Sequence, residues 1–285
     1  MKKILVTGSK GMLGQDLCPE LKNAGFIVIE THKQNMDITN FNQSEYVIKY
    51  YKPDYVIHCA AYTNVDKAEE DYKTAFAINE TGTKNLAKIC AELNIPIIYI
   101  STDYVFDGEA KEPYKPTDKR NPLGVYGASK AKGEEAIENY CSKYYIARTS
   151  WLYGLKGKNF VETMINLGQK MPEINVVNDQ IGCPTWTMEL AKGILNLIKN
   201  EKPYGIYHIC GSGQTSWYDF AKEIFGSEGI KTPINPCSTD KFPRSANRPK
   251  YSAMENSEIC RNWQEALKDY LLLRKELNLQ TNLKG

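Results

Sequence analysis

Short apolar runs alternate with amphipathic stretches along most of the chain. Runs of roughly four to eight apolar residues that end in turn residues are typical of buried strands. Stretches whose apolar positions recur three or four residues apart are typical of helices packed on a core. Their alternation predicts an α/β fold with a doubly wound parallel sheet. The predicted strands are 3–7, 26–30, 53–61, 95–100, 145–149, 175–180 and 205–210, and the predicted helices are 15–23, 74–93, 128–137, 160–170, 188–199, 216–225 and 258–277.

A glycine-rich turn follows the first predicted strand, with Gly8, Gly11 and Gly14 three residues apart. Gly8 suits the backbone of a tight turn. Gly11 would let the backbone approach a pyrophosphate, and Gly14 would let the next helix pack closely. That helix would present free N–H groups to the phosphates. The spacing is G-x-x-G-x-x-G rather than G-x-G-x-x-G, but its place between a strand and a helix predicts dinucleotide binding in a Rossmann-type fold.

The end of the second strand should contact the adenosine ribose of such a cofactor. Glu30 would bind a 2′-hydroxyl and favours NAD, whereas His32 and Lys33 would attract the 2′-phosphate of NADP. These opposing charges predict that NADPH and NADH are both used, with kcat/KM values within about thirtyfold of each other. Asp37 could reach the adenine amine, or could begin the next helix as a cap, as could Thr39.

The strongest candidate chemistry involves Tyr126 and Lys130. They lie four residues apart at the start of the predicted helix around 128–137, so their side chains should share a face. An ammonium beside a phenol favours the phenolate. The pair could therefore give and take a proton near neutral pH. Thr102 follows the strand 95–100, at the edge where open α/β sheets bind ligands, and could bond the same carbonyl oxygen. The alternative is an ordinary loop and a surface helix.

Two other strand ends should also face the ligand. Ala60 and Ala61 end the third strand, and such small residues would permit close approach of a cofactor. The alternative is that they are packed in the core. Trp151 lies just beyond the strand 145–149, on the same edge.

At about 150 residues per domain, a chain of 285 residues predicts one large domain or two. We expect residues 1–150 to form a dinucleotide-binding domain. Residues 151–285 should form mainly a smaller substrate-binding part that caps the ligand edge of the sheet. Strands and helices near 176–225 should return to the first domain.

Composition narrows the class of partner. The net charge of +2 gives no reason to expect nucleic acid or an anionic membrane. No apolar run approaches the about 18 residues of a membrane span, and the run after Met1 is too short for a signal peptide. The eight cysteines form no C-x-x-C pair, as expected for buried thiols of a cytoplasmic protein. The three histidines form no metal-ligand motif.

With these residues in view, the chain resembles the extended short-chain dehydrogenase/reductase family from residue 3 to at least residue 253. The similar segments are 60–69, 101–108, 126–130, 148–154 and 179–185, and 126–130 reads Tyr-Gly-Ala-Ser-Lys.

The resemblance implies NADPH- or NADH-dependent reduction of the C4 ketone of a dTDP-linked 4-keto-6-deoxy sugar, giving dTDP-L-rhamnose. It implies that Tyr126 donates the proton, that Lys130 holds the nicotinamide ribose and that Thr102 bonds the carbonyl oxygen. Asp103 would place the sugar, and Trp151 would pack against the sugar or nucleotide. It implies cofactor contacts by residues 10–13, Asp37, Ile38 and residues 60–62. Together with the residues argued above, the full predicted set of cofactor contacts is Gly8, Lys10, Gly11, Met12, Leu13, Gly14, Glu30, Asp37, Ile38, Ala60, Ala61, Tyr62, Ile100, Tyr126 and Lys130.

The segment 244–249 is similar to a family segment that often reads Ala-Arg-Arg-Pro, with Asn247 in place of one arginine. Arg248 is the candidate for the substrate phosphates, because a guanidinium can bind a phosphate through two parallel hydrogen bonds. The alternative is a surface salt bridge.

Some family members bind a divalent cation between subunits, but their acidic residues have no match here, so we predict no metal. A homodimer is compatible with the resemblance. The rival functions are another nucleotide-sugar reductase or epimerase, and a non-catalytic regulatory subunit that binds cofactor. The intact Tyr126–Lys130 pair weighs against the last of these.

Overall fold

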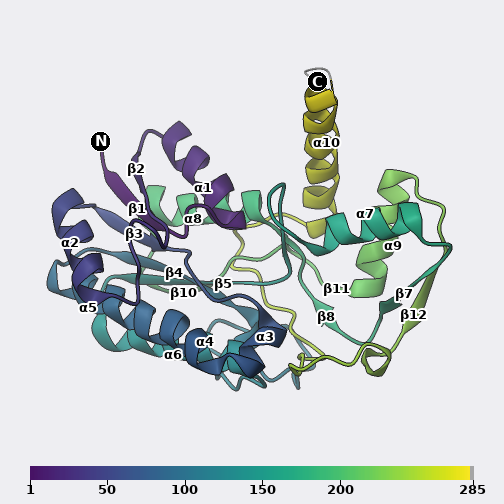
Figure 1. Cartoon of the computed structure of the whole chain (residues 1–285), viewed down its shortest axis with the longest axis horizontal. Coiled ribbons are helices and arrows are strands. Elements are labelled where there is room, and N and C mark those ends of the chain that lie inside the picture. Colours follow the sequence, from purple (N-terminus) through teal and green to yellow (C-terminus); the bar gives the residue numbers. More distant parts are fainter. Residues whose placement is uncertain (283–285) are drawn as a thin grey trace.

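The computed structural model describes residues 1–282 and is built around one six-stranded parallel sheet (Figure 1). The strand order is β10-β5-β4-β3-β1-β2. The chain adds β2 on one side of β1 and β3 on the other, and this reversal opens a crevice at the carboxyl ends of β1 and β3. The strands are β1 (Lys3–Thr7), β2 (Ile27–Glu30), β3 (Tyr55–His58), β4 (Ile97–Thr102), β5 (Tyr144–Thr149) and β10 (Gly205–His208).

Helices cover both faces of the sheet, which explains why its central strands are apolar on both sides. Ile4 and Val6 face one layer and Leu5 faces the other, and all three are fully buried. In Figure 1 the first layer lies above the sheet, and the second extends from its left side to below it. The first layer is α1 (Met12–Asn23) and α8 (Thr187–Lys199), and the second is α2 (Phe41–Tyr51), α5 (Thr83–Glu92) and α6 (Val125–Tyr140), with the short α3 (Val65–Glu70) and α4 (Tyr72–Phe76) beside it.

A second lobe lies beyond the carboxyl ends of the strands, with its own aromatic core (Figure 1). Phe220 packs against Tyr153 and Trp263 there, and Tyr270 contacts Tyr153 edge to face. Its helices are α7 (Phe160–Lys170), α9 (Trp217–Glu228) and α10 (Trp263–Asn282), and its strands are β6 (Leu152–Tyr153), β7 (Ile174–Val177), β8 (Ile181–Gly182), β9 (Thr185–Trp186), β11 (Thr215–Ser216) and β12 (Ile234–Cys237).

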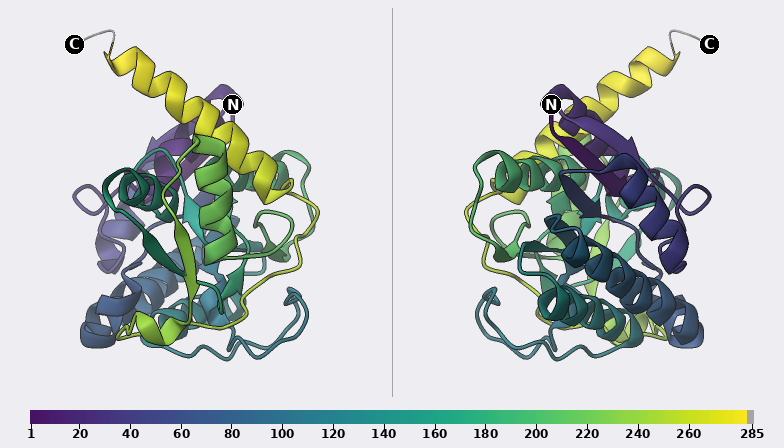
Figure 2. Two further views of the ribbon diagram at one scale, coloured as in Figure 1. Left: turned by 90° about the vertical axis from the view of Figure 1, so that its right-hand side faces the viewer. Right: turned by 90° about the vertical axis from the view of Figure 1, so that its left-hand side faces the viewer.

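The chain passes between the two lobes more than once. Within the stretch 176–225, only α8 and β10 join the sheet lobe, while β8, β11 and α9 stay in the second lobe. The last helix, α10, packs its first turns on the second lobe and then extends away from the body (Figure 2). Among residues 1–282, no helix is both long enough and apolar enough to cross a lipid bilayer.

Several element bounds differ from the prediction; the last helix, for example, begins at Trp263 rather than at residue 258. Two differences bear on the site. The predicted helix 74–93 is interrupted by a π-helical turn, Ala77–Gly82, in which Asn79 turns inward. The Asn79 amide accepts from the backbone N of Tyr62 at 2.8 Å and donates to its carbonyl at 3.0 Å, so it holds the loop after β3. The next difference is at α2, whose cap is Asn40, because Asp37 bonds Thr39 instead.

Candidate active site

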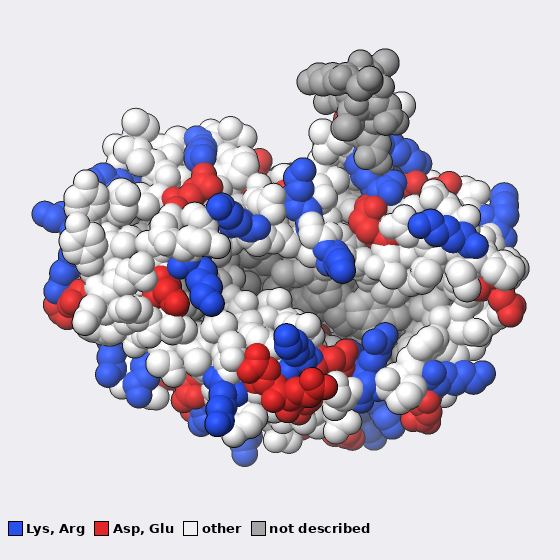
Figure 3. All heavy atoms as spheres, viewed as in Figure 1, with Lys and Arg blue, Asp and Glu red and all other residues white. Residues whose placement is uncertain are grey.

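A cavity of about 1010 Å³ opens at the carboxyl ends of the sheet strands, between the two lobes. It is lined by the glycine turn, the loop after β2, the ends of β3, β4 and β5, the start of α6 and the first residue of α9. Figure 3 shows it as a hollow whose rim carries both basic and acidic side chains. Lys10, Lys33 and Lys73 are among its lining residues, and such charges attract phosphates.

The glycine turn is packed too closely for side chains. Gly8 has a φ of +66°, and a Cβ there would lie 2.7 Å from the Ala60 nitrogen. A Cβ at Gly14 would lie 2.6 Å from the Gly8 carbonyl oxygen, so helix and turn touch directly. No side chain caps α1 at Gly11, and its first N–H groups are free for a ligand. The turn therefore fits the pyrophosphate of a dinucleotide.

The adenosine end of the cavity contains some of the predicted residues but not all of them. His32, Lys33, Asp37 and Ile38 line it. Hydrogen bonds from Thr39 hold the pKa of the Asp37 carboxyl below its usual value.

Glu30 is not among the residues that line this cavity, and its contact with the ribose stays a prediction. Its carboxylate lies 2.6 Å from the ammonium of Lys22, on α1. The direction of a long side chain at a strand end depends on which partner the tertiary structure places nearby. For Glu30 that partner is Lys22, which lies outside the cavity.

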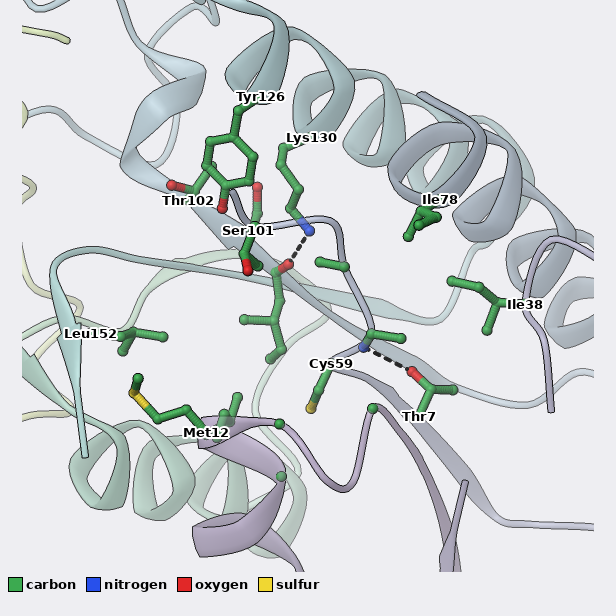
Figure 4. Close-up of a pocket in the computed structure, with 18 of the residues that line it drawn as sticks. Thr7, Met12, Ile38, Cys59, Ile78, Ser101, Thr102, Tyr126, Lys130 and Leu152 are labelled. Atoms are coloured by element: carbon green, nitrogen blue, oxygen red, sulfur yellow. Dashed lines mark hydrogen bonds between the residues drawn. The ribbon is translucent and has the colours of Figure 1, made fainter. Parts of the chain in front are cut away.

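The end of β3 approaches the glycine turn closely. Ala60 and Ala61 line the cavity, and the Thr7 hydroxyl accepts from the Ala60 nitrogen at 3.1 Å (Figure 4). Tyr62, also predicted to contact the cofactor, is not among the lining residues. Its backbone is held by Asn79.

The predicted catalytic residues lie together. In Figure 4, Tyr126 and Lys130 extend from α6 toward Ser101 and Thr102 at the end of β4. The Lys130 ammonium donates to the Ile100 carbonyl at 2.7 Å. Together these groups form one corner of the cavity.

The electrostatics of this corner differ from the prediction that Lys130 eases the ionisation of Tyr126. Burial raises the pKa of Tyr126 to about 12, partly offset by a hydrogen bond with Thr102. Burial lowers the pKa of Lys130 to about 7, against the attraction of Glu134. The Lys130 ammonium points to the Ile100 carbonyl rather than to the phenol, so desolvation dominates both groups.

A buried carboxylate, Glu134, fixes this corner to the sheet. It accepts from the Ser101 hydroxyl at 2.5 Å and from Arg148 of β5 at 2.7 and 3.0 Å. Arg120 is a third partner, with a hydrogen bond of 2.9 Å. Although burial opposes it, pairing with Arg148 holds the pKa of Glu134 below its usual value. Because Glu134 is one turn beyond Lys130, it sets where the catalytic face of α6 lies.

The predicted substrate residues Asp103 and Trp151 also line the cavity. The Asp103 carboxylate accepts from the Thr102 hydroxyl at 3.0 Å, and its second oxygen has no partner among the described residues. Burial raises the pKa of this carboxyl to about 6. Trp151 stacks on Trp217, the first residue of α9.

Arg248, the predicted phosphate ligand, is not brought to the cavity. Its guanidinium donates to both oxygens of Asp66, at 3.1 and 2.8 Å. Asp66 also accepts from the Ala246 nitrogen, and its carbonyl accepts from the Ser245 hydroxyl. These bonds attach residues 245–248 to α3. Arg248 therefore forms the salt bridge that was the alternative, and its contact with the substrate phosphates stays a prediction.

Sequence reasoning did not single out Tyr104, Ser150, Leu152 or Trp217, all of which line the cavity. Tyr104 lies inside the segment 101–108, which the sequence placed near the site, but the sequence does not show in which direction its side chain points. Trp217 lies more than sixty residues after Trp151 in the sequence and follows a different strand. No local pattern links it to the site. Across residues 1–282, no group of three or more His, Cys, Asp or Glu side chains could hold a metal ion.

The doubly wound sheet, with a cavity at the point where its strand order reverses, defines a Rossmann-type α/β protein, which confirms the predicted fold class. Residues 1–275 match the family model described as the RmlD substrate binding domain, and the chain belongs to that family.

Three relatives illustrate the similarity. The spore coat polysaccharide biosynthesis protein SpsK of Bacillus subtilis is 40% identical, over 95% of this chain and 97% of its own. A dTDP-4-dehydrorhamnose reductase of Clostridium acetobutylicum is 48% identical, with a TM-score of 0.93 over 96% of this chain and 99% of that one. The dTDP-4-dehydrorhamnose reductase of Bacillus anthracis, solved in complex with NADP, is 40% identical, with a TM-score of 0.92 over 95% and 99%.

The adenosine end predicts a modest preference for the phosphorylated cofactor. Glu30 is paired outside the cavity while Lys33 lines it, so NADPH should be favoured over NADH, still within about thirtyfold. Lys33→Ala should lower kcat/KM for NADPH about fivefold and leave NADH unchanged, because an exposed charge contributes about 1 kcal/mol. Lys84→Ala, an exposed lysine on α5, is the control. Equal losses of kcat/KM with NADPH and NADH would show that Lys33 does not contact the 2′-phosphate.

The Asp66–Arg248 pair predicts a measurable coupling. Arg248→Ala and Asp66→Asn should each lower the free energy of unfolding, and the double variant should lose less than their sum. The coupling should be about 0.5–1 kcal/mol, because the pair is partly exposed. Urea unfolding of the four proteins measures it. Strict additivity would show that the two side chains do not interact in solution.

Proposed function

We propose that this chain reduces the C4 ketone of dTDP-4-dehydrorhamnose to dTDP-L-rhamnose, with NADPH or NADH as the reductant. The observation that carries the proposal is the position of Tyr126, Lys130 and Thr102 at one corner of a cavity whose opposite side is the glycine turn. Two reductases of this name share the fold at 48% and 40% identity, and one of them binds NADP.

The cofactor side of the cavity would hold a dinucleotide by backbone contacts. The N-terminus of α1 and the turn at Gly8 and Gly11 would bind the pyrophosphate, and Ala60 and Ala61 leave room beside it. When bound, the nicotinamide supplies a hydride to the ketone carbon. The protein's task is then to neutralise the charge that develops on the ketone oxygen.

Tyr126 is suited to give the proton. Its raised pKa keeps the phenol protonated at neutral pH, which a general acid requires. Thr102 would stabilise the same oxygen by a hydrogen bond, without comparable acidity. Lys130 would bind the nicotinamide ribose and stabilise the phenolate left on Tyr126.

The substrate would occupy the side of the cavity away from the glycine turn. Asp103 would accept hydrogen bonds from sugar hydroxyls, and Trp151 would offer an apolar surface to the sugar or nucleotide.

We place the enzyme in the cytoplasm, because all eight cysteines are free thiols. A homodimer also remains a proposal, which sedimentation analysis would test.

Turnover of the sugar nucleotide tests the function directly. The unstable 4-keto sugar is generated in place from its precursor by the upstream enzymes, and NADPH oxidation is followed by absorbance. Mass spectrometry should show a product two mass units heavier than the ketone. Failure to oxidise NADPH, with cofactor binding intact, would favour a non-catalytic cofactor-binding role instead.

Tyr126→Phe removes only the hydroxyl and should lower kcat by about 10²–10⁴-fold, with NADPH affinity nearly unchanged. Tyr140→Phe, at an exposed site of the same helix, is the matched control. Single-turnover measurements should be used so that hydride transfer limits the rate. More than a third of wild-type activity in Tyr126→Phe would mean that the proton comes from elsewhere, with Asp103 the next candidate.

Lys130 and Thr102 should give different signatures. Lys130→Met should lower kcat and weaken NADPH binding together, because it removes both proposed roles. Thr102→Val should lower kcat about 10–100-fold with cofactor binding retained, the effect of one hydrogen bond in the transition state. Calorimetric titration with NADPH beside steady-state kinetics separates the two. Unchanged NADPH affinity in Lys130→Met would show that Lys130 does not bind the nicotinamide ribose.

A further inference from the structure

Two stacked tryptophans line one side of the cavity. The rings of Trp151, just beyond β5, and Trp217, at the start of α9, are stacked with centroids 3.4 Å apart and planes within 5°. Both residues line the cavity. Among the described lining residues, Trp217 is the only one that follows Leu152 in sequence. It is therefore the contact through which α9 of the second lobe reaches the site.

The second lobe fixes both rings. The Trp217 indole N–H donates to the Gln180 side chain at 3.1 Å. The Phe160 ring packs against the Trp217 ring, with 4.5 Å between their centroids. Trp151 adopts a φ of +47°, which is unfavourable for a bulky residue and persists only where surrounding contacts enforce it. Gly182 supplies one such contact, because a Cβ there would lie 2.4 Å from the Trp151 ring.

The stack lies on the substrate side of the cavity. Trp151 lies two residues after Thr149, whose register partner between β4 and β5 is Thr102. Asp103 is the next residue after Thr102, so the ketone-facing corner and the stack are adjacent. The glycine turn that would hold the cofactor phosphates comes from β1 and α1 instead. An indole surface suits the apolar face of a sugar ring or a pyrimidine.

We propose that Trp217 is a substrate-positioning residue for the sugar nucleotide: it lines the cavity and holds the Trp151 ring in its binding position. The inference rests on the proposed function and adds to it a residue from the second lobe. It follows that substrate binding depends on how α9 is seated, whereas cofactor binding does not.

The variants separate this role from general stability. Trp217→Ala removes the stack, and Trp217→Phe keeps an aromatic face but loses the bond to Gln180. Gly182→Ala is an independent variant, because its new Cβ displaces Trp151 while Trp217 stays intact. Gly168→Ala is the control: its Cβ would meet Phe225 equally closely, at 2.4 Å, but inside the second lobe's core.

The measurements are the Kd for dTDP-L-rhamnose and for NADPH by calorimetry, KM and kcat for the keto sugar, and Tm. Trp217→Ala and Gly182→Ala should raise the Kd and KM for the sugar nucleotide about 10–100-fold, the loss of a stacking contact and of ring position. NADPH Kd should stay within about twofold. Trp217→Phe should give an intermediate value, and Gly168→Ala should lower Tm without changing either Kd.

The outcomes are distinct. If the wild type binds and reduces the dTDP-sugar but Trp217→Ala and Gly182→Ala match it, Trp217 has no such role and the proposed function stands. If NADPH and sugar nucleotide affinities fall equally, the stack is structural and the inference is wrong. If the wild type neither binds dTDP-L-rhamnose nor oxidises NADPH with the keto sugar, the proposed function fails, and the inference that rests on it fails too. Should Trp217→Ala not fold, Gly182→Ala and Trp217→Phe decide the question.

Discussion

The geometry of the catalytic corner depends on one buried carboxylate. Glu134 receives hydrogen bonds from Ser101 of β4 and Arg148 of β5, so a single side chain of α6 is tied to two neighbouring strands. Both members of the Glu134–Arg148 pair are almost fully buried. Loss of one partner from such a pair typically costs about 3–5 kcal/mol, because the other charge is left buried and unpaired. The helix can therefore neither slide nor rotate without breaking this pair.

That constraint explains how a pattern as short as Tyr-x-x-x-Lys acquires a fixed relation to a hydroxyl some twenty residues earlier. Tyr126 and Lys130 share a face because they are one turn apart, but nothing in that spacing places them over β4. Glu134, the next residue on that face, does so through Ser101, the neighbour of Thr102. Catalytic geometry here is a property of the packing between helix and sheet.

The alternation of apolar runs predicted the doubly wound sheet, and the spacing of three glycines between a strand and a helix predicted the glycine turn, because both signals are local in sequence. Side-chain direction was not predictable in the same way. Glu30 lies at the expected strand end, but its carboxylate meets Lys22 of α1, which only the folded chain brings near. Arg248 likewise meets Asp66 of α3. Trp217 comes from another lobe, and the π-helical turn around Asn79 is stabilised by a loop distant in sequence.

The order in which the chain visits the two lobes limits how the fold can be recombined. After β5 it enters the second lobe, returns to supply α8 and β10 to the sheet, and leaves again. The edge strand β10 and the helix α8 therefore belong to the cofactor lobe in space, but lie in the sequence between segments of the second lobe. A new substrate specificity could not be transplanted by joining one front half to another back half. Such a graft would have to replace two separate stretches and leave α8 and β10, with the loop between them, in place.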